Sequence, residues 1–485
     1  MELKKQTIHG ATWSAIDNVA SSGITFLVGI VLARILTPTE FGIAGMIAIF
    51  IAVSNSIVES GFSAALIRKI SANEKDYNTV FYFNLLVGIV LFTLLYVCAP
   101  LISRFFKEPL LISVTRVIGT VIILNAFGII QRTILVKQID FKTQAKISVI
   151  ASVVSGIVGI GMALMGFGVW SLVGQQVSRQ LFNSLLLWLY NQWRPSWVFS
   201  TKSLKDLFGF GSKLLLSGLI NTIYNNIYYV IIGRFYSADQ LGQYTRAEQF
   251  NSIFSSNLTN VVQRVSYPAL CHIQDEEERL REAYRKVIKT TMLITFACML
   301  GLAAVAKPLI LTLIGEKWLP AVAYLQILCF SGMLYPLHAI NLNILQVKGR
   351  SDLFLKLEII KKIIGVVPIV LGIFYGIEAM LLCGVLTSII CYFLNSYYSA
   401  RLINYSTKNQ VEDIMPALCV SLIVAAIMWS LSLLQLPMII LLLLQCVVGL
   451  ALALFIYEKM HLAEYGEVKQ IAVSLLNKKW KRQLQ

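Results

Sequence analysis

The chain has 485 residues, of which 57% are hydrophobic and only 14% are charged, and its mean hydropathy is +0.72. A soluble protein of this length could not bury so many apolar side chains, so the composition excludes a soluble enzyme or a soluble binding module. The formal net charge of +16 would suit a nucleic-acid partner, but the positions of the basic residues give it another explanation.

Apolar stretches of about 20 residues recur from one end of the chain to the other, and each is long enough to cross a hydrocarbon core of about 30 Å. A span in lipid must satisfy its own backbone hydrogen bonds, so we interpret these stretches as helices. We expect about fourteen of them, near residues 12–35, 41–63, 79–101, 112–134, 146–166, 168–190, 207–232, 239–266, 286–306, 320–345, 353–374, 377–400, 412–432 and 437–457. The predicted fold class is an all-α polytopic membrane protein.

The basic residues gather on one side of these predicted helices. If the helices are numbered along the chain, most of the 41 Lys and Arg residues fall at the N-terminus, in the loops that follow even-numbered helices, and at the C-terminus. Cytoplasmic loops carry such an excess, so both termini are predicted to be cytoplasmic. The net charge therefore reflects membrane topology and attraction to anionic lipids of the phospholipid bilayer, and we expect no nucleic-acid partner.

Two segments 200 residues apart have the same pattern. Residues 30–42 read IVLARILTPTEFG and residues 230–242 read VIIGRFYSADQLG, so that Arg34 and Gly42 correspond to Arg234 and Gly242. We interpret these as duplicated structural turns, in which each Arg caps the C-terminal end of a helix and suits its dipole.

An even number of predicted helices separates the two copies, so both halves enter the membrane in the same orientation and form a parallel repeat. The predicted organisation is a six-helix bundle at 1–200, a second six-helix bundle at 201–404, two additional membrane helices at 405–457, and a basic amphipathic cytoplasmic tail at 458–485.

Polar residues recur at helical spacing within four of the predicted spans. They are Asp17, Ser21 and Thr25 in the first helix, Asn55, Ser56, Glu59 and Ser63 in the second, Asn221, Tyr224, Asn225 and Tyr228 in the seventh, and Arg246, Gln249 and Ser256 in the eighth. Such residues either hydrogen-bond packed helices to each other or line a hydrated cavity. We favour a substrate cavity for the set, because the stripes of the first and seventh helices coincide at the repeat offset.

Ionised side chains indicate which residues of the predicted cavity have a function. Placing one at the centre of a membrane helix costs about 3 kcal/mol or more, so it is rarely kept without a role. We predict that Arg246 contacts an anionic ligand and that Asp17 and Glu59 are candidates for ion coupling. Alternatively, Asp17 pairs with a neighbouring cation and Glu59 reaches water at the helix end. The eight Cys and four His residues have no metal-binding spacing, so we expect no metal and no cofactor.

Several short motifs carry a family resemblance. They are GATWSAI at 10–16, LARILTPTEFG at 32–42, GFGVWSLV at 166–173, RFYSADQLGQYTRA at 234–247 and SYPAL at 266–270. With these the chain resembles the Wzx-type polysaccharide and O-antigen repeat-unit flippases, a branch that includes the colanic acid exporter, within the multidrug/oligosaccharidyl-lipid/polysaccharide exporter superfamily.

The resemblance implies a function. It implies two bundles that open alternately to each side of a bacterial inner membrane, and a polyprenyl-diphosphate-linked oligosaccharide as substrate. It also implies a role in lipopolysaccharide or exopolysaccharide export, alongside a polysaccharide polymerase and chain-length machinery. Cavity cations are expected to hold the diphosphate in this superfamily, and Arg246 matches that role.

Two other functions are considered. A cation-coupled multidrug antiporter of the same fold would favour an acidic, aromatic cavity, and Arg246 argues against it. An enzyme would need clustered acids or bases, commonly on a sizeable loop outside the cytoplasm, whereas the loops on that side are short. We therefore predict a flippase and not an enzyme.

The variant Arg246→Ala is expected to abolish export of the lipid-linked repeat unit, because it removes the predicted anion contact. The protein should still fold and insert, which its level in isolated membranes would check. Normal surface polysaccharide in cells that carry only this variant would contradict the anion-binding role.

Overall fold

The computed structural model describes residues 2–59, 61–69, 71–460, 465–466 and 469. Every regular element within these ranges is a helix, which confirms the predicted all-α class. The helices divide into two compact units, Met1–Thr245 and Arg246–Gln485. The predicted boundary of the repeat at residue 200 lies inside the first unit and stays a prediction. Most of the predicted tail at 458–485 lies outside the described residues.

Within the described residues, the first unit is built from nine helices and the start of a tenth. They are α1 (Glu2–Ile35), α2 (Pro38–Glu59), α3 (Phe62–Arg68), α4 (Glu74–Phe106), α5 (Leu111–Ile118), α6 (Thr120–Lys137), α7 (Phe141–Leu164), α8 (Val169–Tyr190), α9 (Thr201–Phe235) and the beginning of α10 (Ala238–His272). Within this unit α7 packs between α1 and α8, α8 packs against α6, and α9 packs along α2 and α4.

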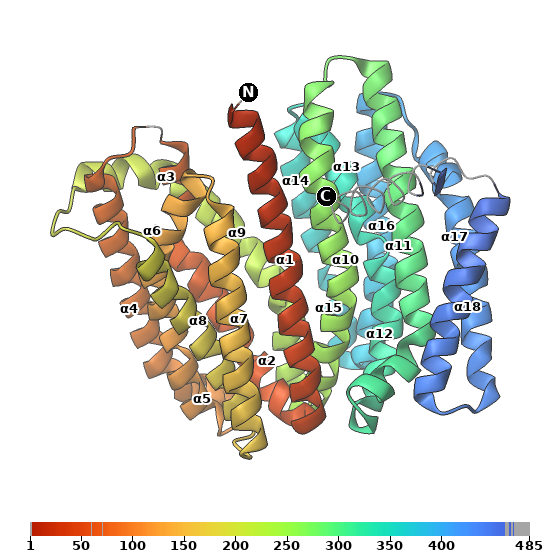
Figure 1. Ribbon diagram of the computed structural model, residues 1–485, viewed down its shortest axis with the longest axis horizontal. Helices are drawn as coiled ribbons and strands as arrows, with labels where there is room; N and C mark the ends of the chain where they lie inside the picture. The colour runs from red at the N-terminus through yellow and green to blue at the C-terminus, as the bar shows by residue number, and fades with distance from the viewer. Residues whose placement is uncertain (1, 60, 70, 461–464, 467–468, 470–485) are drawn as a thin grey trace, which may run out of the picture. The chain divides into compact units, whose positions relative to one another are not determined.

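The second unit contains the remainder of α10 and the helices that follow. They are α11 (Glu277–Leu313), α12 (Leu319–Gly332), α13 (Tyr335–Val347), α14 (Ser351–Ile364), α15 (Val366–Tyr375), α16 (Ile377–Ile403), α17 (Thr407–Ser430) and α18 (Met438–Lys459), with short 3-10 turns at Glu316–Trp318 and Leu431–Leu434. The two predicted additional helices, α17 and α18, pack against each other and against α11 (Figure 1). Arg285 of α11 joins them through a paired contact with Asp413 of α17, at 2.5 and 2.6 Å.

Within the described residues, eleven stretches of helix are long and apolar enough to cross a membrane. The chain is therefore a multi-pass membrane protein, as predicted. Each of the other three predicted spans is helical but departs from a continuous apolar helix. Polar residues along α8 and α10 lower their hydropathy, and a break at Gly365 divides the remaining span into the two short helices α14 and α15.

The duplicated turns begin α2 and α10 with the same capping structure. The Oγ1 atom of Thr37 accepts a hydrogen bond from the Glu40 backbone N–H at 3.4 Å, and the Thr37 N–H donates to the Glu40 carboxylate at 2.6 Å. Ser237 and Gln240 make the same two bonds, at 3.2 and 3.3 Å. This is the capping box, in which a Ser or Thr and a Glu or Gln three residues later satisfy the first free N–H groups of a helix.

The two copies also pack against each other, and their contacts are reciprocal. A Cβ atom on Gly42 would lie 1.7 Å from the carbonyl oxygen of Ala238, and a Cβ atom on Gly242 would lie 1.8 Å from that of Pro38. Gly242 and Ala238 are the residues that correspond to Gly42 and Pro38 at an offset of 200 residues, so the two contacts are equivalent. Glycine is required at both positions because the backbones approach too closely for any side chain.

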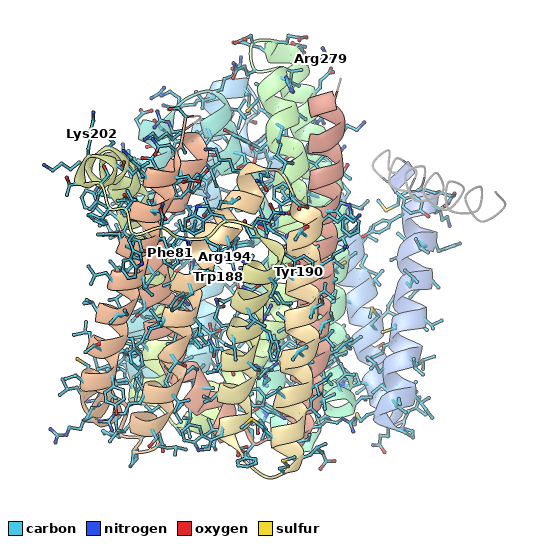
Figure 2. All side chains as sticks on the ribbon, turned by 60° about the vertical axis from the view of Figure 1, so that its left-hand side comes forward. Phe81, Trp188, Tyr190, Arg194, Lys202 and Arg279 are labelled. Carbon is cyan, nitrogen blue, oxygen red and sulfur yellow. The ribbon has the colours of Figure 1, made fainter. Side chains whose placement is uncertain are left out.

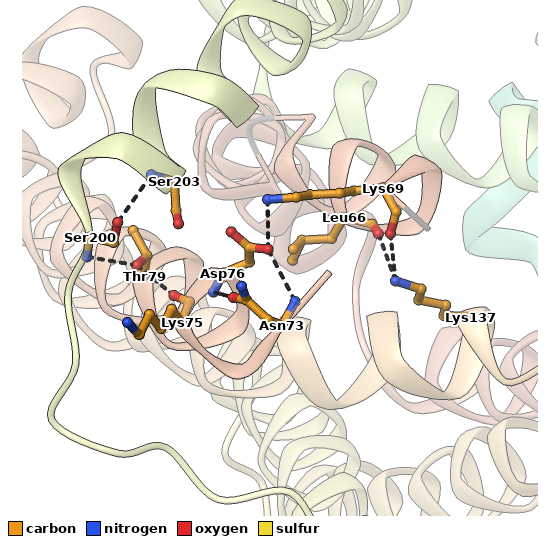
Figure 3. A network of polar contacts seen from close by, with 9 residues as sticks. All are labelled: Leu66, Lys69, Asn73, Lys75, Asp76, Thr79, Lys137, Ser200 and Ser203. Atoms are coloured by element: carbon orange, nitrogen blue, oxygen red, sulfur yellow. Dashed lines mark hydrogen bonds and ion pairs between the residues drawn. The ribbon is translucent and has the colours of Figure 1, made fainter. Parts of the chain in front are cut away.

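A polar network closes the turn between α3 and α4 (Figure 3). The buried carboxylate of Asp76 caps α4 together with Asn73, through reciprocal bonds of 3.1 Å, and pairs with the Lys69 ammonium at 2.7 Å. Lys137, in the last turn of α6, donates to the carbonyl oxygens of Leu66 and Lys69. These bonds connect α3, α4 and α6 at one end of the bundle.

Hydrogen bonds from side chains to the backbone hold the connection from α8 to α9 in place (Figure 2). The Arg194 guanidinium donates to the carbonyl oxygens of Asn191 and Trp188 at 2.6 and 2.9 Å and lies 5.5 Å from the centre of the Trp188 ring. Further along, the Ser200 N–H donates to Thr79 of α4 at 3.0 Å. This predicted junction between the two halves is therefore attached to the first unit.

The variant Gly42→Ala is expected to destabilise the protein by about 3 kcal/mol, because the new methyl group meets backbone that cannot rotate away. The matched control is Gly161→Ala, because a Cβ atom there would meet nothing within 4 Å. The control should be neutral or stabilising by up to roughly 1 kcal/mol, from its better helix propensity. Thermal unfolding of the purified proteins in detergent measures both, and equal midpoints would contradict the contact.

Candidate functional site

A polar stripe runs along α8. Gln176, Arg179, Gln180 and Asn183 are spaced by three or four residues, which places them on one face of the helix. Arg179 is exposed and Asn183 is half-buried. A polar face on a membrane helix must meet either polar neighbours or water.

The stripe faces a cavity of about 470 Å³ inside the first unit. Helices α1, α2, α6, α7 and α8 contribute its polar lining, which consists of Asp17, Asn55, Arg132, Gln144, Ser148, Gln176, Arg179, Gln180 and Asn183. Apolar side chains, such as Ile147 and Leu187, complete the wall. The volume lies within the range of about 300–1,000 Å³ that is typical of small-molecule sites.

Hydrogen bonds between helices fix part of this wall. Buried Asn125 of α6 donates to the Asn55 side chain of α2 at 3.1 Å and accepts from Gln180 of α8 at 3.2 Å. One turn further along α8, Ser184 donates to the carbonyl oxygen of Leu124 at 2.5 Å. The amides of α2 and α8 are therefore held in place by α6 before any ligand arrives.

The cavity contains more positive than negative charge. Its ionisable lining residues are Arg132, Arg179 and Asp17. Asp17 accepts a hydrogen bond from Ser21 at 2.9 Å, and it attracts Arg179 without forming a direct ion pair with it. Among the described residues, neither guanidinium has a hydrogen-bond or ion-pair partner. Since a guanidinium in lipid is costly, its position at a polar cavity is the expected one.

The second unit uses its polar residues differently. The Tyr284 hydroxyl donates to the Asn341 side chain at 3.0 Å, and Ser399 donates to the same oxygen at 2.5 Å. Nearby, the two ring nitrogens of His338 lie 3.2 and 2.9 Å from Asn395 and Ser388. These side chains hydrogen-bond to each other across α11, α13 and α16, which is a packing role.

The sequence-predicted residues of α1 and α2 lie in or beside this cavity to different degrees. Asp17 lines it, and Ser21 lies next to Asp17. Thr25 instead donates to the Ser21 carbonyl oxygen at 2.7 Å, a bond within its own helix. Glu59 is exposed at the last residue of α2.

The predicted residues of α9 and α10 do not line this cavity. Asn221, Tyr224 and Asn225 are exposed on α9, and Tyr228 is half-buried with its ring 6.4 Å from that of Tyr244. Arg246, Gln249 and Ser256 are half-buried on α10. The roles predicted for these residues remain predictions.

The arginines of the duplicated turns lie at helix ends, and the capping role interpreted from the sequence stays a prediction. Arg34 is in the last turn of α1 and Arg234 is in the last turn of α9. Arg234 donates to the carbonyl oxygen of Phe105 at 2.7 Å, and its guanidinium lies 5.1 Å from the centre of that ring. It therefore attaches the end of α9 to the end of α4.

Most residues that line the cavity were not predicted from the sequence as site residues. The α8 stripe had the same three- and four-residue spacing as the predicted stripes, so its periodicity could have identified it. Arg132 gave no such signal, because it lies near the end of a predicted span, where a basic residue is expected on the cytoplasmic side. Among the described residues, no group of three or more His, Cys, Asp or Glu side chains could hold a metal ion.

Comparison with known proteins places this architecture in a family. The family described as "Polysaccharide biosynthesis protein" matches residues 31–323, which is more than half of the chain. The chain belongs to this family.

Relatives of this family member include proteins of surface polysaccharide pathways. The teichuronic acid biosynthesis protein TuaB of Bacillus subtilis is 31% identical over 72% of this chain and 73% of its own length. The lipopolysaccharide biosynthesis protein WzxC of Escherichia coli is 26% identical over 77% of this chain and 76% of its own length. The resemblance stated from the sequence motifs is thereby confirmed.

Solved structures with the same fold come from two kinds of transporter. The lipid II flippase MurJ in an inward closed conformation aligns with a TM-score of 0.73 at 15% identity, over 93% of this chain and 99% of its own. An inward-facing multidrug resistance MATE family transporter aligns with a TM-score of 0.63 at 16% identity, over 81% of this chain and 100% of its own. At such identities these likenesses establish the fold alone.

The variant Asn125→Ala is expected to lower the free energy of unfolding by about 1–3 kcal/mol, because it removes both hydrogen bonds that Asn125 makes to neighbouring helices. The control is Thr93→Val, since the Thr93 hydroxyl bonds only to the Ile89 carbonyl oxygen of its own helix. Thermal unfolding in detergent compares the two. A loss of stability no greater for Asn125→Ala than for Thr93→Val would contradict the role of Asn125.

Proposed function

We propose that this protein is a flippase that moves polyprenyl-diphosphate-linked oligosaccharide repeat units across the bacterial inner membrane, for surface polysaccharide biosynthesis. The observation that carries the proposal is a hydrogen-bonding cavity of about 470 Å³, lined by the helices of a multi-pass member of a polysaccharide biosynthesis family. The names of its relatives point the same way. WzxC is named for lipopolysaccharide biosynthesis, and a Rhizobium meliloti relative, ExoT, is named for succinoglycan transport.

The chemistry of the cavity suits a sugar head group. An oligosaccharide presents many hydroxyls, which cannot cross hydrocarbon without hydrogen-bond partners. Side-chain amides both donate and accept, so Asn55, Gln176, Gln180 and Asn183 can replace part of the water around a sugar. The lipid tail needs no such cavity and can stay in the bilayer while the head group crosses.

The direction and energy of transport follow from the proposed topology. With both termini in the cytoplasm, an anionic head group moves outward with the membrane potential, which contributes about 2.3 kcal/mol per charge per 100 mV. Alternating access of two bundles would expose the head group to each side in turn. Arg246 is proposed to contact the diphosphate, and Asp17 and Glu59 are proposed as the sites of any coupling ion.

The alternative of a cation-coupled multidrug antiporter has less support. Its support is the fold that this chain shares with MATE transporters. Against it, the cavity is lined by two arginines and one aspartate, and this net positive charge disfavours cationic drugs. We also propose that the protein is not an enzyme, and that its product passes to a polysaccharide polymerase and chain-length machinery.

The variant Ser148→Phe is expected to reduce flipping at least about tenfold, because an aromatic ring would occupy the cavity that the head group needs. The control Ile150→Phe lies two residues away on α7, at a side chain that is 38% exposed and does not line the cavity. Proteoliposomes with a fluorescent lipid-linked oligosaccharide, assayed by its accessibility to an external glycosidase, measure the rate. Gel filtration checks that both variants are folded, and unchanged flipping by Ser148→Phe would exclude the cavity from the transport path.

A further inference from the structure

We propose that the connection between α8 and α9, together with the first two turns of α9, is a binding site for anionic phospholipid. We call residues 190–208 the junction surface. Figure 2 shows Tyr190 and Lys202 toward its two ends, with Arg194 between them. This inference is independent of the proposed transport function, because none of these residues lines the cavity.

The junction surface lies where a membrane helix meets the lipid head groups. Helix α4 is long and apolar enough to cross a membrane, and its predicted apolar span begins at residue 79. There the Ser196 N–H donates to the Asn78 side chain at 2.7 Å, and the Asn78 amide donates back to the Ser196 hydroxyl at 2.8 Å. The Ser200 N–H donates to Thr79 at 3.0 Å. These bonds fix the connection at the boundary of the membrane.

Aromatic side chains project outward from this fixed backbone. The Trp197 side chain is 94% exposed, and its ring stacks on that of Tyr82 with 5.4 Å between the ring centres. Phe199 is 53% exposed. Both lie between Ser196 and Ser200, whose backbone is held by α4, so their exposure is part of the folded structure. Aromatic rings are favoured at the interface between a membrane and water, where lipid can cover them.

Basic side chains follow the aromatic ones at the start of α9. Lys202 and Lys205 are exposed, and Phe208, at the same three-residue spacing, is 50% exposed, so the three share one face of the helix. Leu207 faces inward and packs in the apolar core formed with α3, α4 and α6. One buried apolar face and one exposed face that combines lysines with an aromatic ring are typical of a helix that lies at a membrane surface.

The net charge of the junction surface favours anionic over zwitterionic lipid. Together with the first turn of α4, its exposed charged residues are Lys75, Arg194, Lys202 and Lys205 against Glu74 and Asp206, which leaves two positive units. Basic side chains at a membrane surface are attracted to anionic head groups, whereas a zwitterionic head group has no net charge to offer them. Phosphatidylglycerol therefore fits this surface, with its phosphate at the lysines and its acyl chains beside Trp197.

The test is a titration of the purified protein in detergent with phosphatidylglycerol or phosphatidylcholine, in which native mass spectrometry counts the bound lipids. We expect the wild-type protein to bind phosphatidylglycerol more tightly. The double variant Lys202→Gln/Lys205→Gln should weaken phosphatidylglycerol binding on the order of thirtyfold, as the loss of two basic residues at an anionic surface would give, and leave phosphatidylcholine binding unchanged. The variant Trp197→Ala should weaken the binding of both lipids alike.

The matched control is Lys408→Gln/Lys459→Gln, which removes two exposed lysines at the ends of α17 and α18 and should leave the binding of both lipids unchanged. Thermal unfolding midpoints check that every variant is folded. An equal loss of phosphatidylglycerol binding in the two double variants would overturn the inference, since any pair of lysines would then suffice. Unchanged binding by Trp197→Ala would also overturn it, because the lysines would then be a site for any phosphate rather than for a lipid.

Discussion

The bilayer supplies no hydrogen-bond partners, and this constraint governs every polar side chain in the membrane helices of this protein. In the second unit the cluster of Tyr284, Asn341 and Ser399 meets it through hydrogen bonds among these three side chains. The first unit meets it by lining a cavity, where Arg179 and its neighbours on α8 face a shared polar space. The same residue types therefore serve packing in one unit and a candidate binding site in the other.

The apolar runs were sufficient to predict the fold class, because in lipid length and hydropathy nearly determine that a segment is a helix. The duplicated turns were also predictable, since their capping residues, such as Thr37 and Ser237, act within four positions of sequence. Both predictions depend on local physics. Neither needs to know which helices become neighbours.

The cavity could be predicted only in part, because its walls come from five helices far apart in the sequence. Helical spacing shows that Asp17 and Arg179 each lie on a polar face, but it does not show that these faces meet. Asn125 gives no periodic signal at all, and its importance comes from contacts with α2 and α8. Arg246 was predicted to contact an anionic ligand. That role depends on which side chains surround Arg246 on α10, and it stays a prediction.

The reciprocal contact of Gly42 with Ala238, and of Gly242 with Pro38, has a mechanical consequence. Ala238 is the first residue of α10 and Pro38 is the first residue of α2, so each glycine faces the start of the other helix. Neither helix can therefore be displaced along the other at this point without breaking both contacts at once.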